Sequence, residues 1–156
     1  MSSRFTYDTF GDDEPNLSEG RWIARVKAVM KGKPGKRSFG QLVRALLTLP
    51  QKRLIAGSLC DGTGVCAIGA LGYRHYVDQG MTPQSAWKKM RGAARCGDFS
   101  DGPGIDEFGR DELGLTETLA WLIAEKNDEQ WGHETPEYRY RVMLDWARRH
   151  AEVKDA

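Results

Sequence analysis

The stretch Ser38-Phe-Gly-Gln-Leu-Val-Arg-Ala-Leu-Leu-Thr-Leu-Pro50 decides the fold class of this chain, because its apolar residues recur at helical spacing. Ser38 and Gln41 stand in the Ser-x-x-Gln arrangement of a capping box, which predicts that a helix begins there. Pro50 predicts where the element ends. The apolar residues form one broad face, made of Phe39, Leu42, Val43, Leu46, Leu47 and Leu49.

A second helix is predicted on the N-terminal side of this stretch, with Ser18 as its cap. Its apolar residues recur from Trp22 to Met30, which places the intervening Arg and Lys residues mostly on the outer side. The segment Lys31–Arg37 contains two glycines and a proline and predicts a basic loop that ends this helix. Residues 1–17 predict a loosely held arm, so that the expected domain spans residues 18–152.

On the C-terminal side, an apolar run at 54–59 is followed by turn residues up to Val65, which fit either a small hairpin or an irregular loop. A helix dense in small residues is expected to begin at Cys66. Helix starts are also predicted at Thr82, Thr116 and Thr135, while the glycine-rich and acidic stretch 96–114 predicts a long loop. The sequence therefore predicts a mainly α-helical, single compact domain of about six helices, with at most one small β-hairpin.

The composition is that of an ordinary globular domain. The chain has 156 residues, of which 40% are hydrophobic and 29% are charged, and it lacks the run of about eighteen apolar residues that a spanning helix needs. Three cysteines, an odd number, favour a reducing compartment over a disulfide framework. The first twenty residues lack the apolar segment of a secretory signal, so a cytoplasmic location is expected.

The charges are segregated along the chain, although the formal net charge is only +1. The basic block, residues 21–60, contains ten Lys and Arg and no acidic residue. The acidic block, residues 97–137, contains twelve Asp and Glu against two basic residues. Segregation of this size can steer charged partners, and it leaves open whether the two blocks pair with each other.

Each block predicts a binding surface. Seven cations form a "basic surface" of the kind that contacts phosphates: Arg21, Arg25, Lys27, Lys31, Lys33, Lys36 and Arg37. An overall pI near 7.7 is low for a dedicated nucleic-acid binder, so direct nucleic-acid binding by this surface is the alternative hypothesis. The leading hypothesis is an "acidic face" that binds a protein partner, made of Asp98, Asp101, Asp106, Glu107, Asp111, Glu112 and Trp131.

A third hypothesis is a ligand pocket or a cysteine-dependent enzyme site at Cys66. The start of a helix lowers the pKa of a thiol, and His133 could serve as a base. The small residues around Cys66 equally fit a closely packed, inert helix. The cysteine spacing does not match zinc sites and the acidic stretch does not match an EF-hand, so no metal and no cofactor are expected.

The run Gly64-Val-Cys-Ala-Ile-Gly-Ala-Leu71, followed by Ala124-Glu-Lys-Asn-Asp-Glu129 and Thr135-Pro-Glu137, resembles a group of small uncharacterised bacterial and phage proteins. These share a G-x-C-A-[IL]-G-A-L helix start and a later Asn-Asp turn, and form a domain of unknown function. The likeness covers roughly residues 40–150. It implies that a family function would use Cys66, Asn127 and Asp128, and it favours a phage origin.

Together these features predict a small intracellular protein, phage-encoded and acting in the host cytoplasm, without enzymatic activity. It is expected to bind and inhibit a host complex, such as a nucleic-acid-handling or defence machine, through its charged surfaces. Direct nucleic-acid binding by the basic surface, and a site centred on Cys66, remain the alternatives. No membrane partner is expected.

Overall fold

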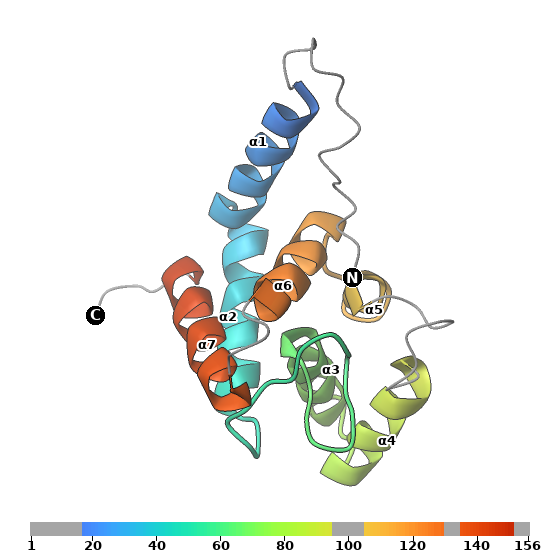
Figure 1. Cartoon of the computed structure of the whole chain (residues 1–156). Coiled ribbons are helices and arrows are strands. Elements are labelled where there is room, and N and C mark those ends of the chain that lie inside the picture. Colours follow the sequence, from blue (N-terminus) through green and yellow to red (C-terminus); the bar gives the residue numbers. More distant parts are fainter. Residues whose placement is uncertain (1–16, 95–104, 130–134, 152–156) are drawn as a thin grey trace, which may run out of the picture.

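The computed structural model describes residues 17–94, 105–129 and 135–151. Within these residues the chain is a single domain of seven helices and contains no strand, which confirms the predicted mainly α-helical class (Figure 1). An isolated antiparallel bridge between Cys60 and Val65 is all that forms in place of the hairpin. The helices are α1 (Leu17–Lys31), α2 (Lys33–Leu47), α3 (Ala67–Asp78), α4 (Pro83–Ala94), α5 (Ile105–Asp111), α6 (Glu117–Glu129) and α7 (Pro136–His150).

Helix α2 lies at the centre of the domain, packed against both α3 and α7. Phe39 and Leu46 on its apolar face are fully buried, as the sequence pattern predicts. The ring of Phe39 meets Trp146 of α7 edge-on, with ring centroids 5.0 Å apart. In addition, the hydroxyl of Tyr140 donates a hydrogen bond of 2.8 Å to the carbonyl oxygen of Leu46, which ties α7 to the end of α2.

Helix α3 is built from small residues because its neighbours approach its backbone closely. A Cβ atom at Gly69 would lie 2.3 Å from the carbonyl oxygen of Leu59. A Cβ atom at Gly72 would lie 2.8 Å from the ring of Phe108 in α5. Only glycine fits at contacts this short. The small residues after Cys66 therefore serve close packing of a buried helix.

The beginning of α2 differs from the sequence prediction. A capping box at Ser38 and a basic loop over residues 31–37 were expected, but α2 begins at Lys33 with Gly32 as its N-cap. Pro34 lies in the first turn, where its missing N–H group costs no hydrogen bond. Only Gly32 separates α1 from α2, so the two helices follow each other end to end and α1 projects beyond the rest of the domain (Figure 1).

Two aromatic residues fix the projecting helix to the body. Trp22 of α1 packs edge-on against Trp121 of α6, with ring centroids 5.0 Å apart and an interplanar angle of 84°. The joint itself leaves no room for a side chain, since a Cβ atom at Gly35 would lie 1.7 Å from the carbonyl oxygen of Val29. The arm predicted for residues 1–17 falls outside the described residues, except that Leu17 begins α1. Ser18, predicted as the cap of this helix, therefore lies inside its first turn.

Helix α5 was not predicted, because it lies inside the stretch 96–114 that was expected to be a loop. Phe108 explains it: this side chain is 3% exposed and fills the space above Gly72, so burial outweighs the weak helix propensity of the surrounding glycines and acids. Residues 95–104 of the expected loop lie outside the described residues.

The four remaining predicted helix starts are confirmed. Thr82, Thr116 and Thr135 each accept a hydrogen bond from the amide three residues later, through the side-chain hydroxyl, at 3.1–3.2 Å. Cys66 caps α3 in the same way, with its sulfur accepting from the amide of Gly69 at 3.4 Å. None of the described helices combines the length and the apolar character needed to cross a membrane.

Candidate functional site

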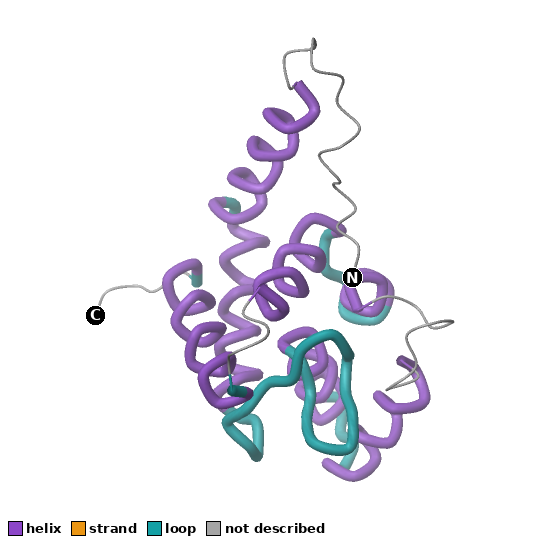
Figure 2. The backbone as a smooth tube through the Cα atoms, viewed as in Figure 1, coloured by secondary structure: helices purple, strands orange, loops and turns teal. Residues whose placement is uncertain are grey.

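A hollow among the described residues lies between the loop that joins α2 to α3 and the facing sides of α3 and α4. Figure 2 shows this loop, residues 48–66, as the long irregular segment beside α3. The cavity has a volume of about 660 Å³, which is within the range of small-molecule sites. Its wall is made of Leu49, Pro50, Gln51, Arg53, Gly62, Thr63, Gly64, Val65, Tyr73, Pro83, Gln84, Trp87, Lys88 and Arg91.

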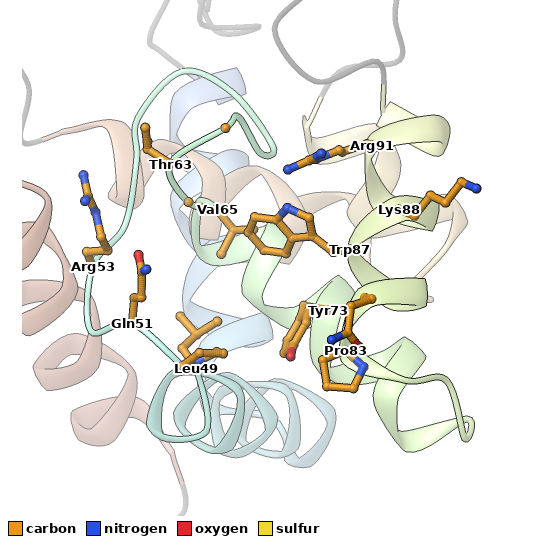
Figure 3. A pocket seen from close by; sticks show the side chains of 14 residues that line it. Leu49, Gln51, Arg53, Thr63, Val65, Tyr73, Pro83, Trp87, Lys88 and Arg91 are labelled. Atoms are coloured by element: carbon orange, nitrogen blue, oxygen red, sulfur yellow. The ribbon is translucent and has the colours of Figure 1, made fainter.

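One side of the cavity wall is aromatic and apolar, and positively charged side chains surround that side. Trp87 lies in the middle of the cavity wall, and Tyr73 meets it edge-on with ring centroids 6.0 Å apart (Figure 3). The guanidinium carbon of Arg91 lies 5.8 Å from the centre of the Trp87 ring and the side chain reaches across the cavity, whereas Lys88 points away from it (Figure 3). Arg53 is the third cation, and none of the lining residues is acidic.

Asp61 stabilises the part of the loop that lines the cavity, although Asp61 itself is not a lining residue. Its Oδ1 atom accepts hydrogen bonds from the amides of Thr63 (2.6 Å) and Gly64 (3.0 Å) and from the Thr63 hydroxyl (2.6 Å). Partial burial alone would raise the pKa of Asp61. The bonds from Thr63 and Gly64 and the positive charge of Arg53 outweigh it, so this pKa lies below its ordinary value. These amides are thus engaged and do not form a phosphate cradle.

Asn127 and Asp128 of α6 hold the same loop in place through hydrogen bonds. Asn127 is 1% exposed; its Oδ1 accepts from the amide of Ala67 at 2.9 Å and its Nδ2 donates to the carbonyl oxygen of Ile55 at 2.8 Å. Asp128 accepts from the amide of Gly57 at 3.0 Å. Both side chains therefore hold a loop whose middle lines the cavity.

Cys66 is buried behind the cavity rather than exposed in it. Burial raises the pKa of its thiol to about 12. The hydrogen bond from Gly69 opposes this increase, while the charge of Asp128 adds to it. The expected lowering by the helix start is thus outweighed by desolvation. A thiol in this state is a poor nucleophile near neutral pH.

The structure brings three of the four predicted pocket residues together, although not as a pocket. Cys66, Asn127 and Asp128 meet where α6 contacts the start of α3, while His133 lies outside the described residues. None of the three lines the cavity in front of them. The cavity was not predicted from the sequence because its wall comes from separate segments, and Trp87 and Arg91, one helical turn apart, are the one local signal of it.

The basic surface is exposed along the outer side of α1 and the first turn of α2. Six of its seven residues are exposed, and Lys36 is half-buried. The ion pairs between described residues are Arg44–Asp78 (2.8 Å), Arg74–Asp78 (2.6 Å) and Arg110–Asp111 (3.0 Å). None of them involves the basic surface or joins the basic block to the acidic block. Among the described residues, the two blocks therefore do not neutralise each other by direct pairing.

The acidic face is only partly described. Asp98, Asp101 and Trp131 lie outside the described residues, and the side chain of Asp106 does as well. Asp111 is exposed and bonds to Arg110 beside it. Glu112 is exposed and reaches the hydroxyl of Tyr76 at 3.5 Å, which adds to the effect of burial in raising the pKa of that tyrosine. The described part of this face is thus Glu107, which is half-buried within α5, together with Asp111 and Glu112 at the end of that helix.

Cys60 is disulfide-bonded, a bond that the odd cysteine count did not predict, and Cys66 is a free cysteine. Within the described part of the chain, no group of three or more His, Cys, Asp or Glu side chains is arranged to hold a metal ion. No protein-family model, curated protein or solved structure matches this chain.

Proposed function

We propose that this protein binds nucleic acid through the basic surface of α1 and α2. The observation that carries the proposal is the exposure of six of its seven cations without an ion pair to a described acidic residue. Such cations can displace the counterions condensed on a phosphate backbone. The release of these counterions is the main source of non-specific affinity for nucleic acid. The end-to-end arrangement of α1 and α2 spreads these charges along a rod (Figure 1).

The biological setting that we propose comes from the sequence. The resemblance to phage proteins favours a phage-encoded protein that occupies the nucleic-acid side of a host machine and inhibits it. In that setting the acidic end of α5, with Asp111 and Glu112 exposed, is available for a basic protein surface. Reversal of the charge of both residues should weaken capture of the host complex and leave nucleic-acid binding intact. Unchanged capture would remove the acidic face from the proposal.

The nucleic-acid proposal is tested by the salt dependence of binding. Fluorescence anisotropy with a duplex DNA and a single-stranded RNA should show affinity that falls linearly with the logarithm of salt concentration. Simultaneous replacement of Arg25, Lys27 and Lys31 by Gln should make the duplex slope shallower by about 0.9 for each phosphate that the protein no longer neutralises. All three are exposed on α1, so the folded state should tolerate the change.

A matched variant separates a local surface from net charge. Replacement of Arg141, Arg148 and Arg149 by Gln removes the same charge from exposed positions of α7, outside the cavity wall. It should leave the slope of the salt titration unchanged. Equal losses in both triple variants would show that net charge alone drives binding, which contradicts a site on α1 and α2. Absence of binding even at about 50 mM salt would reject the proposed function altogether.

A further inference from the structure

The cavity between the α2–α3 loop and α4 shares no residue with the basic surface, so it is a separate candidate site. Three properties of the cavity indicate its ligand. The lining is largely apolar with a central tryptophan, it includes Arg53 and Arg91 without an acidic residue, and its volume of about 660 Å³ suits a small molecule. We propose that this cavity binds a mononucleotide, a planar base that carries a phosphate group.

The aromatic side of the cavity suits the base. Trp87 is half-buried, so part of its ring faces the cavity, and the edge-on contact with Tyr73 fixes the orientation of that ring. Leu49 and Val65 continue the apolar wall on the side of the loop (Figure 3). Bases stack on aromatic side chains through faces that all four bases share, so this wall predicts stacking without strong base selectivity.

The cations suit the phosphate. Arg91 reaches across the cavity above Trp87, where its guanidinium can hold a phosphate beside a stacked base (Figure 3). Arg53 lines the opposite wall and adds a second positive charge to the cavity. The side chains take this role because Asp61 already occupies the amides of Thr63 and Gly64.

The negative charge of Asp61 does not cancel the preference of the cavity for an anionic ligand. Asp61 lies on the loop next to Arg53, but its Oδ1 atom is occupied by three hydrogen bonds from its own loop. The acid does not line the cavity. An anionic ligand would therefore meet Arg91 and Arg53 before it meets a carboxylate, and a neutral ligand would leave both guanidinium groups unused.

The test is calorimetric titration of the whole chain with AMP and UMP, compared with adenosine and with inorganic phosphate. Each mononucleotide should bind at least about tenfold more tightly than either of its halves, since base and phosphate occupy different parts of the wall. Arg91→Gln should weaken AMP binding about tenfold and leave adenosine binding unchanged. The fold should tolerate this change because Arg91 is exposed.

Lys89→Gln is the matched control, since Lys89 lies on the same helix but faces the Tyr76 ring at 4.9 Å and does not line the cavity. It should bind AMP like the unmodified chain. No binding of either mononucleotide at millimolar concentration, or equal losses in the Arg91 and Lys89 variants, would overturn the proposal. Binding of an oligonucleotide through Arg91 without binding of AMP would also overturn it, because the cavity would then belong to the nucleic-acid surface.

Discussion

The side-chain oxygen of Asn127 accepts a hydrogen bond from the backbone amide of Ala67 at 2.9 Å, although sixty positions separate the two residues. The bond joins the end of α6 to the first turn of α3, where the amide has no partner within its own helix. Through the same side chain, Nδ2 holds the carbonyl oxygen of Ile55. One buried amide thus fixes both sides of the loop that forms the cavity wall.

Asn127→Ala should destabilise the fold by roughly 2–4 kcal/mol, because it leaves the Ala67 amide and the Ile55 carbonyl buried without partners. Asp128→Ala should cost less, since its bond goes to the exposed residue Gly57. Chemical denaturation monitored by circular dichroism measures both. A larger loss for Asp128→Ala would contradict the central role of Asn127.

Two glycine-to-alanine changes should act in opposite directions. Gly69→Ala should destabilise the protein by about 1–3 kcal/mol, because the new Cβ atom would meet the Leu59 carbonyl oxygen at 2.3 Å. Gly40→Ala should stabilise it by about 0.5–1 kcal/mol, because Gly40 is exposed within α2 and nothing lies within 4 Å of a Cβ there. Thermal unfolding curves of both variants test the pair, and a gain for Gly69→Ala would refute the close packing of α3.

The link between α7 and α2 can be tested at Tyr140. Tyr140→Phe removes the hydroxyl that donates to Leu46 and should cost about 0.5–1.5 kcal/mol. Tyr138→Phe is the control on the same helix, since Tyr138 is 39% exposed, and it should be nearly neutral. Equal effects in a urea titration would show that the Tyr140 hydroxyl bond contributes nothing specific.

The thiol of Cys66 should react slowly. A pKa of about 12, against an ordinary value of 9.0, lowers the thiolate fraction near neutral pH about a thousandfold. Reaction with a thiol reagent at pH 8, followed by mass spectrometry, should modify Cys66 only after the protein is unfolded. Rapid modification in the folded state would restore the cysteine-dependent hypothesis.

The same thiol gives a signed pH dependence. Its pKa is raised in the folded state, so its contribution to stability is fully present below about pH 9 and is lost as the pH rises toward about 12. Cys66→Ser keeps an acceptor for the Gly69 amide and removes this titration. The serine variant should therefore lose less stability than the unmodified chain between pH 9 and pH 10.5, as measured by denaturation at each pH.

The helices could be predicted where the capping residue and the apolar face are both formed by residues close together in the sequence. Thr116 and Thr135 show this, because a hydroxyl at the cap needs only the amide three residues away. Ser38 failed as a cap because Pro34 allows α2 to begin earlier. Helix α5 was missed because it depends on Phe108 meeting Gly72, a contact between residues distant in sequence.

The candidate site was less predictable than the fold for the same reason. The sequence marks Cys66, Asn127 and Asp128, and these residues do meet, but burial makes Cys66 inert and leaves Asn127 as a support for the loop. The cavity combines Arg53 with Trp87 and Arg91 across a loop and two helices. Neither the desolvation of Cys66 nor the cavity wall formed jointly by distant segments can be derived from the spacing of residues along the sequence.

The joint at Gly35 has a consequence for how charge is presented. The absent side chain there lets the first turn of α2 rest on the carbonyl oxygen of Val29, so it sets the angle between the two helices. Arg25 lies before this joint and Arg37 after it. A larger residue at position 35 would swing one row of cations away from the other without removing any of them. The fit to a phosphate backbone that we propose for this surface would then change at constant net charge, as an alteration of geometry alone.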